Sequence, residues 1–351
     1  MVTRTTESFV YTYDQDGAYT GSPEFGQINN YYTNLPGTHT FTIASGDLTQ
    51  GNTKEEVIVF PWYQEEPFKK ATTYDESLLP HIWTWDEANT DYRNKVPLND
   101  TDGHMYGFLA ESTTYPSATI IDVDNDRLQD IILSNGHLAL LWNIGTPTSP
   151  EFKFDFEYFQ ELNDRASTDP IFSPNAWDYD QDGDYDIAYS YGRSVGTFRY
   201  GMDFFENHGT PTDPLWARNA YLMKNPTTVG SLRFNNYTAG VVIPSNSNES
   251  SAESIWVWNG VLEHLRELRA ETDQQDSFII GTNPELIKLE VNLKQSPPNA
   301  INFGYAIVKS WSNLKELEDW TLTLTTSYSL DGDTSAEIIV SDYDNNVYVF
   351  E

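Results

Sequence analysis

Asp178-Tyr179-Asp180-Gln181-Asp182-Gly183-Asp184-Tyr185-Asp186 is the stretch that decides the fold, and it runs directly into the apolar residues Ile187-Ala188-Tyr189. Carboxylates stand at positions 1, 3, 5 and 9 of this loop, and a glycine stands at position 6. The spacing is typical of a loop that folds around one hard cation, because Ca²⁺ takes six to eight oxygen ligands and glycine permits the sharp turn between them. An EF-hand loop would continue into a helix and end in Glu at position 12. Here the ninth residue opens a β-like run, so we expect the loop to lead into a strand.

Four further segments repeat this pattern with decreasing fidelity. Asp122–Asp130 keeps all four carboxylates and departs only at Arg127, where glycine is preferred. Ser329–Glu337 keeps fewer acids, and Asp47–Glu56 and Ser245–Glu253 are degenerate. An apolar run follows each copy. Recurrence of one unit along a chain indicates a repeat architecture.

The length and composition of the chain limit the classes of protein to which it can belong. The chain has 351 residues, enough for one large β domain or two ordinary ones, and its aromatic content of 14% supplies ample core material. The formal net charge of −33 should repel nucleic acid and anionic lipid surfaces. That acidity fits either a solubilising surface or a surface that partly awaits divalent cations. With no cysteine in the sequence, disulfides and thiolate metal sites are excluded.

Neither a membrane span nor a leader is visible in the sequence. No apolar run approaches the roughly 18 residues that a spanning helix needs. The first residues lack the apolar centre of a signal peptide. We therefore expect either a cytosolic protein or one from which a leader or a larger parent chain has been removed.

The apolar runs are short, rich in Val, Ile, Tyr, Phe and Trp, and bounded by Gly, Asn, Asp and Pro, which is typical of strands. A second repeat marker, Gly-Thr-Pro-Thr-x-Pro, occupies 145–150 and 209–214, in the same order after its loop. Each unit is thus predicted to be a four-stranded antiparallel meander with a cation loop between its first two strands. We predict an all-β fold: a β-propeller with five detectable blades and five to seven in total, because radial repetition protects strand edges.

A single propeller domain over residues 1–351 is the expected organisation. The last unit stops after three strands, and residues 8–13 supply an orphan strand, so residues 1–25 are expected to complete the last blade. The alternative is a fragment whose neighbouring blades are missing. Residues 61–117 and 260–325 are predicted to be insertion-rich or divergent, with a short helix over 260–271.

These residues resemble a known family. Asp-x-Asp-x-Asp-Gly-x-x-Asp followed by apolar residues is similar to the FG-GAP/VCBS repeats of integrin-α-like β-propellers, and the Asn-x-Gly-Thr segments at 143–146 and 207–210 resemble an element of the same blades. In that family the loop carboxylates bind Ca²⁺. The resemblance implies two calcium sites and a plausible third, with these ligands: Asp178, Asp180, Asp182, Asp184 (through its backbone carbonyl) and Asp186; Asp122, Asp124, Asp126, Leu128 and Asp130; Ser329, Asp331, Asp333, Ser335 and Glu337.

The cations are expected to be structural. Four carboxylates within about 5 Å repel one another unless a cation compensates them. An all-oxygen cage at a strand turn offers no open coordination position and no obvious base. We therefore predict Ca²⁺ as a brace and assign no catalytic residue.

Signals for an enzyme are thin. Gly192-Arg193-Ser194-Val195-Gly196 matches the nucleophile-elbow string, but a strand-like run follows where that motif needs a helix, so a hairpin turn is expected. Aromatic residues cluster at Trp62, Trp83, Trp85 and Tyr106, where they either bind a ligand or pack the segment onto the propeller.

The leading hypothesis is a calcium-stabilised recognition, adhesion or assembly module outside the cell or at its surface, with a protein or glycan partner. Millimolar extracellular Ca²⁺ would keep weak sites filled. The alternative is a polysaccharide lyase or hydrolase, or a lectin, on a propeller scaffold, because a fold alone does not choose between functions.

Overall fold

The computed structural model describes the chain in segments. The described residues are 9–13, 25, 27–28, 31, 40–51, 54–62, 79–110, 116–166, 170–177, 182–193, 199–218, 224–225, 230–231, 238–243, 253–259, 265–266, 278–279, 285–291, 305–311, 321–327, 337–342 and 346–350. Beyond Arg218 the description covers the paths of strands alone.

The described part of the chain is mainly β-structure and holds five four-stranded sheets. Three of them follow the chain in strict order. Their strands are β2 (Thr40–Gly46), β3 (Glu56–Trp62), β4 (His81–Asp86) and β5 (Asp91–Pro97); β6 (Ser117–Ile121), β7 (Asp130–Ser134), β8 (Leu138–Asn143) and β9 (Phe152–Asp155); β10 (Ile171–Trp177), β11 (Asp186–Arg193), β12 (Arg199–Asn207) and β13 (Trp216–Arg218).

The other two four-stranded sheets depart from simple chain order. One pairs β17 with β20 across a small hairpin, and the other recruits the first strand of the chain. Their strands are β16 (Thr238–Ile243), β17 (Glu253–Asn259), β20 (Glu285–Val291) and β21 (Tyr305–Trp311); β22 (Thr321–Ser327), β23 (Glu337–Asp342), β24 (Asn346–Phe350) and β1 (Phe9–Tyr13).

The remaining described elements are short. Two two-stranded sheets pair β14 (Lys224–Asn225) with β15 (Gly230–Ser231) and β18 (Leu265–Arg266) with β19 (Phe278–Ile279). The helices described over their full length are α3 (His104–Ala110), the short 3₁₀ helix η3 (Glu157–Phe159) and α4 (Gln160–Ala166). None of the helices in the described segments is long and apolar enough to cross a membrane.

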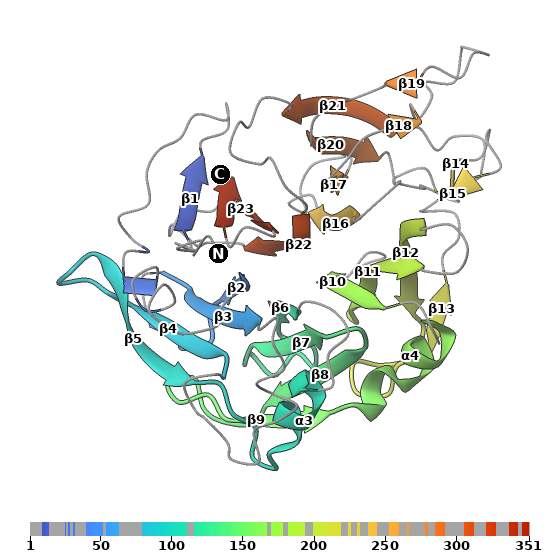
Figure 1. Cartoon of the computed structure of the whole chain (residues 1–351). Helices are drawn as coiled ribbons and strands as arrows, with labels where there is room; N and C mark the ends of the chain where they lie inside the picture. The colour runs from blue at the N-terminus through green and yellow to red at the C-terminus, as the bar shows by residue number, and fades with distance from the viewer. Residues whose placement is uncertain are drawn as a thin grey trace, which may run out of the picture.

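The sheets stand around a common centre, as Figure 1 shows, with β2, β6, β10, β16 and β22 nearest to it. This propeller-like arrangement of four-stranded sheets confirms the predicted all-β class. In each sheet the acidic loop joins the first two strands, and its last acid begins the second strand. These acids are Glu56 in β3, Asp130 in β7, Asp186 in β11, Glu253 in β17 and Glu337 in β23.

The core lies between the faces of neighbouring sheets. On β7, Ile131 and Leu133 pack with the first sheet, whereas Ile132 packs with the third, because successive side chains point to opposite faces. Both faces of this strand are therefore buried, which explains its continuous apolar run. Trp83 is 2% exposed inside the core of the first sheet, so the packing interpretation holds for this aromatic residue.

Two expectations need correction. The strand at the N-terminus joins the last sheet, but β1 runs parallel to β24 rather than antiparallel. Residues 81–97, inside the stretch predicted to be insertion-rich or divergent, form the second hairpin of the first sheet. The helix predicted over 260–271 is wrong at Leu265–Arg266, which form β18. By contrast, β11 and β12 pair as a hairpin around the undescribed residues 194–198, as expected for the Ser194 segment.

Candidate metal centre

The loop between β6 and β7 is curled by its own first carboxylate. Asp122 accepts hydrogen bonds from the backbone N–H groups of Asp126 (3.0 Å) and Arg127 (2.8 Å). Asp124 accepts a further bond from the Asp126 N–H at 3.2 Å. These bonds turn the loop back on itself, because a short acidic side chain satisfies the backbone two to five residues ahead.

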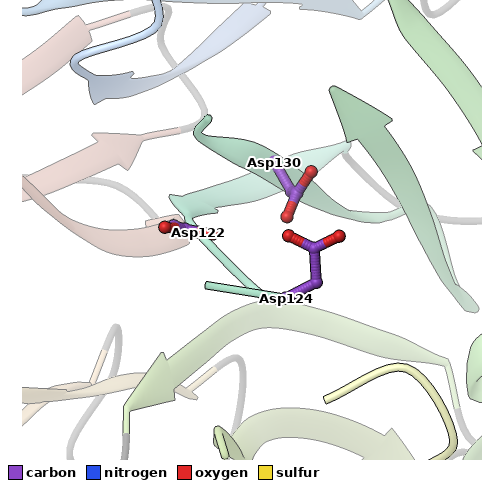
Figure 2. A group of neighbouring side chains, drawn as sticks. All are labelled: Asp122, Asp124 and Asp130. Atoms are coloured by element: carbon purple, nitrogen blue, oxygen red, sulfur yellow. The ribbon is translucent and has the colours of Figure 1, made fainter. Parts of the chain in front are cut away.

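The curled loop brings three carboxylates together. One oxygen each from Asp122, Asp124 and Asp130 lies within 4.8 Å of the other two. Figure 2 shows the carboxylates of Asp124 and Asp130 facing each other. Two ligands of one Ca²⁺ lie at most about 5 Å apart, since each Ca–O distance is about 2.3–2.6 Å. The three side chains therefore fit a calcium ion at the predicted place.

The electrostatics of this group favour a cation. Burial raises the pKa of Asp130 to about 7, and the carboxylates of Asp124 and Asp122 push it in the same direction, while backbone N–H donors oppose the shift. Burial also raises the pKa of Asp124, and so does the neighbouring Asp126. A divalent cation would oppose both shifts, because an opposite charge nearby favours the ionised carboxylate.

Asp130 has a second task that the sequence pattern did not indicate. Its two oxygens accept backbone hydrogen bonds from Val123 and from Asn143, each at 2.8 Å. The side-chain oxygen of Asn143 accepts bonds from the N–H groups of Gly145 (3.2 Å) and Glu151 (3.3 Å). The ninth-position acid thus ties the cation loop to the end of the third strand and to the Gly-Thr-Pro-Thr turn.

The third sheet repeats this connection. Asp186 accepts a bond from the Asn207 N–H at 2.9 Å, and the Asn207 side chain accepts bonds from Gly209 and Leu215, both at 2.9 Å. The sequence did contain a signal for these asparagines, since both copies of Asn-x-Gly-Thr stand at the same place after the acidic loop.

The remaining predicted ligands fall into two groups. Some are described but lie outside the set of three carboxylates. Asp126 is exposed and accepts a hydrogen bond from the Leu128 N–H at 2.7 Å. In the third sheet's loop, Asp182 is exposed, whereas Asp184 and Asp186 are buried. Glu337 begins β23 without a described side chain. The others lie outside the described residues: Asp178, Asp180, Ser329, Asp331, Asp333 and Ser335.

The degenerate loop of the first sheet shows what remains when the carboxylates are lost. Glu56 is fully buried and accepts a bond from the Thr49 N–H at 3.0 Å, so the anchor at the start of the second strand survives. Asp47, at the first position, is exposed. The hydrogen bond from Thr49 to Glu56 in this loop corresponds to the bond from Val123 to Asp130 in the next one.

Side-chain hydrogen bonds join the acidic loop of one sheet to the acidic loop of the next sheet. The side-chain amide of Gln50 donates to the backbone carbonyl of Arg127 at 2.9 Å, and that of Asn125 donates to Gly183 at 3.0 Å. In both cases the fourth residue of one loop reaches the sixth residue of the next. A cation that fixes one loop therefore also fixes the hydrogen-bond partner of its neighbour.

Comparisons with known proteins give distant structural likeness. Neither a protein-family model nor a curated protein matches the chain. Among solved structures, a GH62 hydrolase in complex with xylotriose has a TM-score of 0.43 at 9% identity, covering 97% of this chain and 95% of that one. An α-L-arabinofuranosidase from Podospora anserina in complex with cellotriose has 0.41 at 9%, covering 97% and 91%. The Aleuria aurantia lectin in complex with α-methyl-L-fucoside has 0.42 at 8%, covering 87% and 72%.

Proposed function

We propose that this chain is a calcium-braced β-propeller of five blades, closed by its N-terminal strand, that serves as a recognition module outside the cell. The observation that carries the proposal is the convergence of Asp122, Asp124 and Asp130 at the turn between two strands. A site of this kind stabilises the scaffold that presents a binding surface. The recognition role itself is the step beyond the fold.

Contacts between the innermost strands support closure into five blades. β2 contacts β6, β6 contacts β10, β10 contacts β16, β16 contacts β22, and β22 contacts β2. The last blade is completed when β1 pairs with β24, from Phe9 opposite Asn346 to Tyr13 opposite Phe350. A closed ring of this kind leaves only short, protected edges.

The chemistry of the loop supports Ca²⁺ over other metals. Its side chains offer carboxylate oxygens, and the chain contains no cysteine to hold a softer metal. Asp122, Asp124 and Asp130 would hold the ion, and the family resemblance adds Asp126 and the backbone of Leu128. The same resemblance places a second ion among Asp178, Asp180, Asp182, Asp184 and Asp186, and a third between Ser329 and Glu337. Calcium modules outside cells often bind at about 10⁻⁴–10⁻³ M, where the surrounding Ca²⁺ keeps them occupied.

Calcium titration of three proteins tests the proposal. Asp124→Asn removes one charged ligand from the cluster, and Asp164→Asn makes the same charge change on α4, away from the loops. We expect the wild type and the Asp164→Asn protein to bind the same number of ions and the Asp124→Asn protein to bind about one fewer. Equal calcium content in all three proteins, or none in any, would overturn the assignment.

A further inference from the structure

A pocket of about 270 Å³ opens beside α4 against the outer strands of the third sheet. We call it the α4 pocket. Alternate residues of two strands face it, as expected for one side of a pleated sheet. Its walls are formed by Arg165 on α4, Tyr189 and Tyr191 on β11, Asp203 and Phe205 on β12, and Arg218 on β13.

One wall of the α4 pocket is a fixed pair of opposite charges. Arg218 donates to a single carboxylate oxygen of Asp203 through Nε at 3.0 Å and through Nη2. A guanidinium carries five N–H donors, so this pairing leaves further donors on Arg218. Donors and an acceptor thus stand side by side in a set orientation, which suits a group that both donates and accepts hydrogen bonds.

A second wall is aromatic. The rings of Tyr189 and Phe205 stack at 5.7 Å with an angle of 20° between their planes, and both residues are buried. The guanidinium of Arg165 lies 5.7 Å from the centre of the Phe205 ring and is held by Glu161 at 2.6 Å. The half-buried Tyr191 completes this side of the pocket. Because Tyr189 and Phe205 are only 2% and 1% exposed, the ring that a ligand can reach on this side is that of Tyr191. An aromatic ring packs against the C–H face of a flat ligand while polar neighbours bind its rim.

Charge and size limit what the α4 pocket can hold. Both arginines are paired with a carboxylate, Arg165 with Glu161 and Arg218 with Asp203, so the pocket has no excess positive charge. The chain as a whole carries −33, which repels anions. The one carboxylate that lines the pocket, Asp203, is already paired with Arg218, which disfavours a cation. The volume lies just below the range of about 300–1,000 Å³ for drug-sized ligands, so the occupant is small and neutral.

We propose that the α4 pocket binds one neutral monosaccharide ring. Sugar hydroxyls both donate and accept hydrogen bonds, which matches the Arg218–Asp203 pair, and the C–H face of the sugar ring matches the half-buried ring of Tyr191. This inference rests on the proposed recognition function and names its ligand class. A single ring held by few contacts is expected to bind with Kd on the order of 1 mM.

Saturation-transfer NMR titration of the calcium-loaded full chain tests the inference. The probes are the methyl pyranosides of glucose, galactose, mannose, xylose and fucose, each to about 50 mM, with glucuronate as the anionic comparison. Arg218→Gln removes the guanidinium that pairs with Asp203. Ala166, at the end of α4, also lines the pocket, so Ala166→Phe places a ring there without removing a polar contact. Arg93→Gln is the matched control, because Arg93 also pairs with an aspartate, Asp91 at 3.6 Å, but on β5.

The expected result is saturable binding of at least one methyl pyranoside, weakened about tenfold or more in Arg218→Gln and in Ala166→Phe and unchanged in Arg93→Gln. Binding of none of the five, equal binding by all variants, or tighter binding of glucuronate than of the neutral sugars would overturn it. Calcium content measured on the same samples separates the two proposals. Protein that holds calcium but binds no sugar contradicts the pocket alone, and protein that binds sugar without calcium contradicts the brace alone.

Discussion

At the scale of single residues, the sixth loop position shows how much a backbone angle matters. Arg127 has φ of +76° and Gly183 has +100°, so both stand in the left-handed region that favours glycine. Arg127→Gly should raise the free energy of unfolding by about 1 kcal/mol, because the strain exceeds the entropy that glycine adds. Urea unfolding measures this change.

Gly183→Ala is the reciprocal control. A Cβ at this position would meet no atom within 4 Å, so any loss of stability comes from the backbone angle alone. We expect a loss of about 1–2 kcal/mol. An Arg127→Gly protein that is less stable than the wild type would contradict this account of the loop.

His81 gives the protein a pH dependence at the residue scale. Burial, and then the charge of Lys95, lower the pKa of His81 to about 4, while the unfolded chain keeps about 6.5. The unfolded state therefore takes up the proton first, and stability is full above about pH 6.5 and falls as the pH drops toward 4. The loss from this group is up to about 3 kcal/mol.

Denaturant unfolding between pH 4 and pH 7 checks the His81 prediction. His81→Gln should fall less steeply over this range than the wild type, whereas His104→Gln, a change at an exposed residue on α3, should follow the wild type. Parallel curves for all three proteins would show that burial of His81 does not govern the slope.

At the scale of elements, the Gly-Thr-Pro-Thr turn is held too tightly for any side chain at its glycine. A Cβ on Gly145 would collide with the backbone of Ser149 and Glu151, and one on Gly209 with that of Asp213 and Leu215. Gly145→Ala should therefore cost roughly 2–4 kcal/mol, because backbone atoms cannot move aside as a flexible side chain does. Gly107→Ala on α3, where the space is open, should be neutral or stabilising in the same thermal melts. Equal melting temperatures for the two variants would be the contrary result.

The elements that the sequence predicted well are those with local signals. The acidic loop marks the start of each second strand because carboxylate spacing and the following apolar run are both read within a dozen residues. The outer strand β5, with the sequence Asp91-Tyr92-Arg93-Asn94-Lys95-Val96-Pro97, was not predicted, because three of its seven residues are exposed and it carries no alternating apolar pattern. The Leu spacing at 260–271 misled at Leu265–Arg266, because so short a pattern is not enough to specify a helix.

Long-range features were beyond the sequence. Side chains alternate with a period of two in parallel and in antiparallel strands, so the sequence pattern does not indicate that β1 runs parallel to β24. The bonds from Asp130 to Asn143, and the loop contact between Asn125 and Gly183, join residues that only folding brings together. The same holds for the α4 pocket, whose lining comes from one helix and three strands.

At the scale of the whole molecule, bound calcium would offset part of the negative charge of the chain. Two or three bound ions would offset about four to six of the 33 excess negative charges, two for each ion. Because the loops of neighbouring sheets share hydrogen bonds, an ion in one loop also stiffens the junction with the next. Removal of calcium is therefore expected to weaken the packing between sheets as well as single turns.

The most direct test of the calcium brace is a thermal melt of the full chain, first with Ca²⁺ in millimolar excess and then with EDTA, beside elemental analysis of the bound metal. At an excess of about 100 times Kd each site stabilises the fold by about 2.7 kcal/mol, so EDTA should lower Tm by roughly 5 °C or more. Bound calcium should be about two ions for each chain. A protein that carries no calcium and melts at the same temperature with and without EDTA would contradict the central claim.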